Sequence, residues 1–200
     1  MLRYIPDQRS VLSYFMASDT TTSSAPAPAP TSDVVVTEDP VEVCTIFCDG
    51  ACANNGRRGA RAGYGVAVFL NDSEIAATSR PLGPEETQTN QRAELRGLET
   101  ALAAAVGTSA PICRIYTDSE YAINCLTRWG PGWARAGWRK ADGGPVLHRD
   151  IIEPLLETWR SLRGKATLSH VRAHTGRSDV LSRGNARADD LARASLFSDE

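Results

Sequence analysis

The sequence has little of several things that would narrow its class at once. Of its 200 residues, 6% are aromatic, three are histidine and two are methionine, and the net charge at neutral pH is only −2. A chain with so little net charge is not a polycation, so contact with nucleic acid would need a local basic patch. No apolar run approaches the roughly 20 residues that a membrane-spanning helix needs. We therefore expect no membrane partner.

Cysteine is scarce as well. The count of five is odd, and with no secretory signal it favours reduced thiols in an intracellular protein, leaving nucleus, cytoplasm and mitochondrion open. The spacing of Cys44 and Cys48 invites a metal site. On a strand, however, the two would lie about 13 Å apart, too far to share one ion. We interpret them as buried strand thiols.

Residues 1–40 differ in composition from the rest. The stretch TTTSSAPAPAPTS at 20–32 is low in complexity and typical of an extended linker. The segment before it carries arginines but also a proline and an aspartate, so a structureless tail is the simplest interpretation. A weak targeting presequence and a short docking segment are the alternatives. We expect a disordered leader over 1–40 and one folded domain over 41–198.

The folded part alternates between strand-like and helix-like patterns. Apolar runs, with a turn at Asn71-Asp72, predict strands over 41–49, 63–70, 74–80, 111–118 and 165–171. Helix-forming composition predicts helices over 90–106, 119–129, 147–163, with a kink at Pro154, and 185–197. The segments 130–145 and 174–184 are predicted to be loops. This order implies an α/β protein with a mixed sheet and helices on both faces.

Four acidic residues fall where this arrangement brings them to one edge of the sheet. Asp49 and Asp118 end two strands, and parallel neighbours would place both at the edge where open α/β sheets bind ligands. Glu94 and Asp189 each share a helical stripe with apolar residues, which should turn both side chains towards the sheet.

Each acid also has an interpretation without chemistry. Asp118 would serve as a helix N-cap, Glu94 as a partner of Arg61 or Arg114, and Asp189 as an ordinary acid near a helix start. Four carboxylates together are different. At an effective dielectric of about 20, two carboxylates about 4 Å apart repel by roughly 4 kcal/mol. Such a cluster would take up protons or bind hard cations such as Mg²⁺.

Five blocks of the sequence resemble ribonuclease H of the eukaryotic type 1 class. They are TIFCDGACANNGRRGARAGYGV, TQTNQRAELRGLETAL, IYTDSEYAI, WGPGWARAGWR and VRAHTGRSDVLSRGNARADDLA, and they follow the family order from about Val43 to Phe197. The resemblance implies the ribonuclease H-like fold, a five-stranded mixed sheet with helices on both faces. It also implies a monomer that hydrolyses the RNA strand of RNA–DNA hybrids, leaving 5′-phosphate and 3′-hydroxyl ends.

The same resemblance implies a two-metal site. The metal-binding acids of the family fall on Asp49, Glu94, Asp118 and Asp189, and its mobile-loop histidine falls on His174. Two Mg²⁺ ions are implied, with Mn²⁺ as a substitute. In this mechanism one ion activates a water and the other stabilises the leaving 3′-oxygen.

Substrate contacts are implied residue by residue. Asn55, Asn90 and Gln91 match residues that contact the RNA strand near its 2′-hydroxyls, which amides can both donate to and accept from. Turn and N-cap roles would also explain the two asparagines. Trp129 and Trp133 match residues along the DNA strand in a basic protrusion, although core packing would explain tryptophans too.

One implied subsite departs from the family pattern. Relatives often hold a DNA phosphate with an Arg, a Thr and an Asn, and here those positions are Thr87, Thr89 and His148. We therefore expect a weaker grip on the DNA strand. Two rival interpretations remain: a hybrid-binding module that has lost catalysis, and a ribonuclease H domain derived from a retroelement.

Overall fold

A five-stranded mixed sheet forms the centre of the computed structural model, which describes residues 41–172 and 179–197. The strand order is β3-β2-β1-β4-β5, in which β1 pairs antiparallel with β2 and parallel with β4. The strands are β1 (Val43–Ala53), β2 (Arg61–Leu70), β3 (Ser73–Pro81), β4 (Ile112–Thr117) and β5 (Ala166–His170). All five predicted strands are present, and β1 is central, as its apolar character on both faces predicts.

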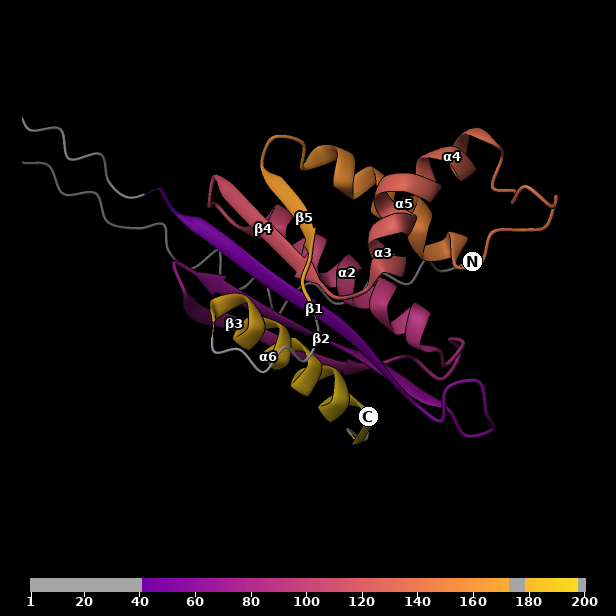
Figure 1. Ribbon diagram of the computed structural model, residues 1–200, viewed down its shortest axis with the longest axis horizontal. Helices are drawn as coiled ribbons and strands as arrows, with labels where there is room; N and C mark the ends of the chain where they lie inside the picture. Colours follow the sequence, from indigo (N-terminus) through magenta and orange to yellow (C-terminus); the bar gives the residue numbers. More distant parts are fainter. Residues whose placement is uncertain (1–40, 173–178, 198–200) are drawn as a thin grey trace, which may run out of the picture.

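Helices cover both faces of the sheet. Figure 1 shows α6 on one face and α2 on the opposite face, with α5 lying beyond α2. The helices are α2 (Asn90–Gly107), α3 (Glu120–Asn124), α4 (Gly130–Arg135), α5 (Arg149–Ser161) and α6 (Val180–Ala194), with a π-helical turn η1 (Cys125–Trp129) and a 3₁₀-helix η2 (Ser195–Phe197). Within the described ranges, no helix is both long and apolar enough to cross a membrane.

Two segments that were predicted to be loops are partly helical. Residues 130–135 form helix α4 rather than loop, because the chain continues from the π-helical turn without a break. The last helix begins at Val180, five residues earlier than predicted. Asp179 stabilises that start, since its side chain accepts a hydrogen bond from the Ser182 backbone N–H at 2.9 Å.

The first strand is longer than predicted, and this changes the place of Asp49. The last parallel pair between β1 and β4 is Phe47 with Tyr116, whereas antiparallel pairing with β2 continues as far as Ala53 and Arg61. Asp49 therefore lies inside β1, just past the point where β4 stops accompanying it. Beyond that point one side of β1 is open to side chains from other elements.

Glycines allow both covering helices to approach the sheet closely. A Cβ added at Gly50 would lie 2.3 Å from the Glu94 backbone nitrogen of α2. A Cβ added at Gly65 would lie 2.3 Å from the Ala188 carbonyl oxygen of α6. Side chains at these positions would push the helices away. The close contacts bring the residues around Glu94 and Asp189 next to β1.

Candidate active site

Asp49 points towards the face of the sheet that α6 covers. Its cross-strand partner is Gly65, and paired residues of neighbouring strands present their side chains to the same face. The α6 residues against Gly65 are Ala188 and Ala192, which flank Asp189 in the helix. The Asp49 residue is only 8% exposed, and its Oδ1 accepts a hydrogen bond from the Gly50 N–H at 2.7 Å.

Glu94 approaches the same edge from the opposite face. It lies in the second turn of α2, whose inward stripe of Leu98, Ala101 and Ala105 is fully buried, as predicted. Its carboxylate accepts hydrogen bonds from the Asn90 amide at 2.7 Å and from the Ser119 hydroxyl at 2.6 Å. The structure thus pairs Glu94 with neutral donors at the end of β4 and the start of α2.

Asp118 directly follows β4, but it does not cap the next helix. Ser119 is the N-cap of α3, because its side chain accepts a hydrogen bond from the Ala122 N–H at 3.0 Å. The Asp118 side chain instead accepts a hydrogen bond from the Asn185 amide nitrogen at 3.0 Å. The alternative interpretation of Asp118 as a helix N-cap is therefore wrong. The carboxylate is directed towards α6.

Asp189 completes the set from α6. Its side chain is 16% exposed and forms an ion pair with Arg193 at 2.6 Å. The neighbouring Asp190 also contacts Arg193, at 3.1 Å, but its side chain is 69% exposed. Two adjacent acids on one helix therefore differ in direction. Asp189 lies against the sheet, and Asp190 faces solvent.

The four carboxylates act on one another electrostatically. Burial, followed by the charge of Asp118 and then those of Asp189 and Glu94, raises the pKa of Asp49 to about 7, although the hydrogen bond from the Gly50 N–H lowers it. Burial and the charge of Asp118 also raise the pKa of Glu94. The charges of the other three acids thus act on Asp49, and the negative field that Arg193 does not offset favours binding of a cation.

The donor set fits a hard divalent cation, since it consists of carboxylate oxygens at a partly buried edge. Among the described residues, no three Asp, Glu, His or Cys side chains lie in a compact group with the geometry of a metal centre.

Sequence reasoning missed Asn185. This residue is 4% exposed and lies one helical turn before Asp189, on the buried stripe that includes Ala188 and Ala192. Its Nδ2 binds Asp118, while its Oδ1 is buried with no hydrogen-bond partner among the described residues. A buried, half-satisfied amide is costly unless a site requires it. Its signal in the sequence is a polar residue on an apolar helical stripe.

The residues expected to read the RNA strand lie beside Glu94. Asn55, at the exposed turn between β1 and β2, accepts a hydrogen bond through Oδ1 from the Asn90 backbone N–H at 3.3 Å. Asn90 in turn holds Glu94, and Gln91 is exposed next to it. Asn90 is not the N-cap of α2, since Thr89 fills that place.

The residues expected to face the DNA strand form a row of rings. Trp133 lies 5.8 Å from Trp129, Trp129 lies 6.1 Å from Tyr121, and Tyr121 lies 6.4 Å from His148, measured between ring centroids. Both tryptophans are partly buried against the core. Each therefore packs on the core with one part of its ring and leaves another part exposed to solvent. Tyr121 is a second residue that sequence reasoning missed.

Three residues stand at the phosphate subsite that differs from the family pattern, and their environments differ. Thr87 is exposed, Thr89 caps α2, and His148 is half-buried with its backbone in the left-handed region at φ 58°. Burial, and then the nearby charge of Arg92, lower the pKa of His148, so it is neutral near pH 7. His174 lies outside the described residues, and its role stays a prediction.

Comparison with known proteins identifies the family. The family model of ribonuclease H (RNase H) matches residues 41–197, so the chain belongs to the ribonuclease H family. It is 36% identical to a ribonuclease H of Cyanothece sp. over 157 residues, which are 76% of this chain and 88% of that protein. It is 39% identical to ribonuclease HI of Pseudomonas aeruginosa over 152 residues, 76% of this chain and 91% of that one.

A solved structure supports the fold. The PFV RNase H domain superposes with a TM-score of 0.64 at 23% identity, covering 77% of this chain and 94% of that chain. The ribonuclease H-like fold and the assignment as a ribonuclease H enzyme, both predicted from the sequence, are therefore confirmed. The relatives named above are bacterial, and the eukaryotic type 1 subclass stays a prediction.

Proposed function

We propose that this ribonuclease hydrolyses the RNA strand of RNA–DNA hybrids with two Mg²⁺ ions and leaves 5′-phosphate and 3′-hydroxyl ends. The observation that supports the proposal is that Asp49 is buried within reach of the charges of Asp118, Asp189 and Glu94, and burial together with these charges raises its pKa to about 7. Asp49, Glu94, Asp118 and Asp189 would hold the ions, with Mn²⁺ as a substitute. When bound, the ions would activate a water and stabilise the leaving 3′-oxygen.

The protein's own residues orient this site. The Gly50 N–H fixes one Asp49 oxygen, and Ser119 and Asn90 fix both Glu94 oxygens. Asn185 fixes one Asp118 oxygen. Asp49, Glu94 and Asp118 thus each have an oxygen in a set direction before substrate arrives, which lowers the reorganisation needed for the reaction.

Strand discrimination follows from the Asn55–Asn90–Glu94 chain of hydrogen bonds. The backbone N–H of Asn90 binds Asn55 and its side chain binds Glu94, so a contact with a 2′-hydroxyl would be linked directly to an acid of the centre. DNA lacks that hydroxyl. We expect cleavage of RNA paired with DNA, little or no cleavage of duplex RNA, and none of duplex DNA.

A gel assay tests the proposal. End-labelled hybrid, duplex RNA and single-stranded RNA are incubated with the protein in Mg²⁺ or in EDTA, and the product ends are mapped. We expect cleavage of the hybrid alone, dependent on Mg²⁺. A hybrid with 2′-deoxy sugars around one scissile bond should resist cleavage there. Equal cleavage at the substituted bond would refute the proposed contacts.

Paired variants separate metal binding from a general loss of charge. Asp189→Asn should abolish nearly all cleavage and retain hybrid binding, because it removes a proposed metal ligand but keeps the side-chain shape. Asp190→Asn is the matched control, since it removes the adjacent, exposed carboxylate that also contacts Arg193. Similar turnover in the two variants at saturating Mg²⁺ would contradict the assignment.

A further inference from the structure

Two cysteines face each other across the parallel pair of β1 and β4. Cys44 and Cys113 are partners in the register of these strands, which lie side by side in Figure 1. In-register residues of neighbouring strands present their side chains to the same face of a sheet, and the strands are about 4.8 Å apart. Disulfides usually join Cα atoms that are about 4.4–6.8 Å apart. The two residues therefore stand at a separation that a disulfide can span.

The other three cysteines have no cysteine opposite them. In the antiparallel register of β1 and β2, Cys48 is paired with Val66 and Cys52 with Ala62. Cys125 lies in η1, away from both strands. All five cysteines are free thiols in this structure. The geometry thus singles out one pair.

This pair lies in the core, under the C-terminal half of α2. Both residues are fully buried, and the Cys113 thiol donates to the Ala105 carbonyl oxygen of α2 at 3.8 Å. Thr108, which caps the end of α2, hydrogen-bonds Cys44 through its side chain. Lys165 donates from Nζ to the Thr108 carbonyl oxygen at 2.5 Å. A cation therefore lies beside two adjacent thiols.

The hydrogen bond between the two thiols separates their acidities. That bond, followed by the charge of Lys165, lowers the pKa of Cys113 to about 7, although burial opposes both. The same hydrogen bond, followed by burial, raises the pKa of Cys44. The thiolate is the form of cysteine that oxidants attack. Cys113 is thus the reactive sulfur, and Cys44 is a protonated thiol placed to resolve its oxidised form.

The pair is close to the end of the strand ladder. Only the pair of Val43 with Ile112 lies beyond it in the parallel register. Ile112 is 38% exposed and Val41, just before the strand, is 61% exposed. Opening of the last pairs of a ladder requires much less free energy than unfolding of the domain. Such an opening would admit a small uncharged oxidant to both sulfurs.

We propose that Cys44 and Cys113 are a site of reversible oxidation, where hydrogen peroxide converts the two thiols into a disulfide that joins β1 to β4. The inference does not depend on the proposed function. Asp49 and Asp118 each lie five residues further along the chain than one of these cysteines. At about 3.3 Å per residue this is about 16 Å. The bond would therefore tie together the strands that lead to these acids without entering the acidic site.

The reaction needs two steps and one peroxide. The Cys113 thiolate attacks a peroxide oxygen, so that an S–O bond forms, the O–O bond breaks and hydroxide leaves. The proton that Cys113 had released converts this hydroxide to water. The Cys44 sulfur then attacks the sulfenic acid, so that the S–S bond forms and the S–O bond breaks. The second hydroxide leaves with the Cys44 proton as water. Two thiols and one peroxide thus give one disulfide and two waters.

The bond should be easy to reverse. Cβ atoms joined by a disulfide are usually about 3.5–4.5 Å apart, closer than the spacing of neighbouring strands. The two strands would have to move together slightly, and strained disulfides are the ones that reductants open most readily. A dithiol reductant should therefore restore both thiols.

Peptide mapping of the full chain tests the proposal. The reduced, folded protein is treated with hydrogen peroxide, its remaining thiols are alkylated in denaturant, and the digest is analysed by mass spectrometry. Cleavage after Phe47 separates Cys44 from Cys48 and Cys52. We expect a peptide linking Cys44 to Cys113, which dithiothreitol separates, and alkylated thiols at the other three cysteines.

Single substitutions provide matched controls. Cys44→Ser and Cys113→Ser should each abolish the linked peptide. Cys125→Ser should leave it unchanged, since Cys125 is as deeply buried but lies away from the pair. Cys44→Ser should also drive Cys113 on to sulfinic acid, because no neighbouring thiol intercepts the sulfenic acid. Lys165→Met should slow bond formation about fivefold at pH 7, the effect of raising the Cys113 pKa by about one unit.

The wild-type result alone can overturn the inference, so it does not rely on the folding of any variant. Five alkylated thiols after peroxide treatment would overturn it, as would a link that joins other cysteines. A link between Cys44 and Cys113 that forms in urea but not in the folded protein would also overturn it, because the sulfurs would then not meet in the native sheet. Cleavage of hybrid is not part of this measurement, so failure of the proposed function would leave the outcome unaffected.

Discussion

The amide of Asn185 donates a hydrogen bond to the carboxylate of Asp118 at 3.0 Å, which links α6 to the end of β4. Asn185 has no direct place among the proposed metal ligands, so it acts by orienting one of them. Loss of such an orienting partner typically costs about 10- to 100-fold in metal affinity or activity. We expect Asn185→Ala to raise the Mg²⁺ concentration for half-maximal activity by about tenfold.

A structural role alone would not produce that shift. Titration of Mg²⁺ separates the two effects, because excess Mg²⁺ should restore much of the activity if orientation of Asp118 is the cause. Asn185→Asp provides a second test, since it places a fifth carboxylate beside the four. A variant whose activity falls equally at all Mg²⁺ concentrations would argue against the orienting role.

Gly50 sets the distance between β1 and α2. The contact with the Glu94 backbone leaves no room for a methyl group, so Gly50→Ala must separate the strand from the helix. We expect a loss of about 1–3 kcal/mol in the free energy of unfolding. We also expect a lower initial rate under conditions where the variant is still fully folded. Urea unfolding and initial rates measure the two. Gly132→Ala, where a Cβ meets nothing within 4 Å, is the control.

The raised pKa of Asp49 predicts how the metal-free protein responds to pH. The folded state keeps the Asp49 proton up to about pH 7, whereas the unfolded state releases it near pH 4. Between these values the folded state binds more protons, so its stability falls as pH rises. The loss is at most about 4 kcal/mol, taking 1.36 kcal/mol for each pKa unit.

Urea unfolding in EDTA at pH 5 and pH 8 measures this effect. We expect the difference between the two pH values to be smaller in Asp49→Asn than in wild type, since that side chain does not titrate. Mg²⁺ should stabilise wild type more at pH 8 than at pH 5, because it competes with the proton. Identical pH profiles for the two proteins would contradict the electrostatic coupling.

His170 and His174 should differ in their contribution to turnover. His174 matches the mobile-loop histidine, for which we expect Ala to lower kcat by about ten- to a thousand-fold through lost proton transfer. His170 lies on β5, and its Nε2 contacts the Asp118 backbone oxygen at 3.1 Å. His170→Ala should lose much less activity. Equal losses at the two positions, measured as kcat at saturating hybrid, would point to a shared structural defect.

Much of the fold was predictable because the hydrophobic patterns of single segments match the secondary structure that those segments adopt in the folded domain. The alternation of apolar runs with helical stripes predicted all five strands, and the hairpin turn at Asn71-Asp72 has positive φ at both residues, as tight hairpins require. The stripe below Glu94 predicted its inward direction. Strand and helix geometry singled out the four acids, and their metal-binding role, which the resemblance implies, stays a prediction.

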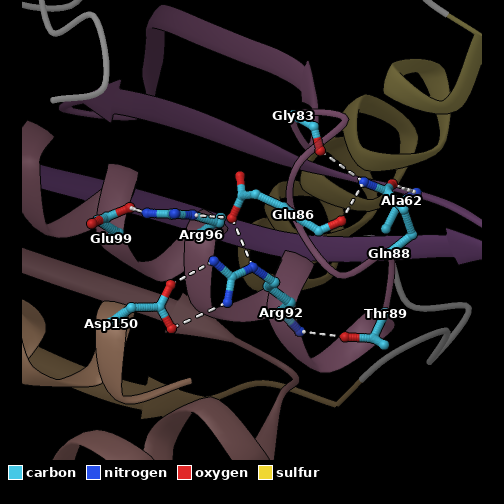
Figure 2. A network of polar contacts seen from close by, with 9 residues as sticks. All are labelled: Ala62, Gly83, Glu86, Gln88, Thr89, Arg92, Arg96, Glu99 and Asp150. Carbon is cyan, nitrogen blue, oxygen red and sulfur yellow. Dashed lines mark hydrogen bonds and ion pairs between the residues drawn. The ribbon is translucent and has the colours of Figure 1, made fainter. Parts of the chain in front are cut away.

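The relationships that sequence reasoning missed depend on contacts between distant segments. The ion pair between Arg92 and Asp150 (Figure 2) joins residues 58 apart in the sequence, and the hydrogen bond between Asn185 and Asp118 joins residues 67 apart. No local periodicity in the sequence predicts contacts over such separations. The end of β1 was placed too early because pairing with β2, rather than composition, extends it to Ala53. Ser119 displaced Asp118 as N-cap because both residues can cap and only packing decides between them.

The pairing of β1 has a consequence for the order in which the protein opens. Strand β1 is bonded to β2 on one side and to β4 on the other, so its amide hydrogens should exchange with solvent only when most of the domain unfolds. All four acids lie on or beside β1, β4, α2 and α6, whereas the row of rings belongs to the segment from α3 to the start of α5. We expect α4 and the start of α5 to exchange much faster. If the row of rings contacts the DNA strand, as the resemblance implies, a form opened there would release that strand while β1 and the helices on its two faces stay folded, so that a product could leave without unfolding the centre that made it.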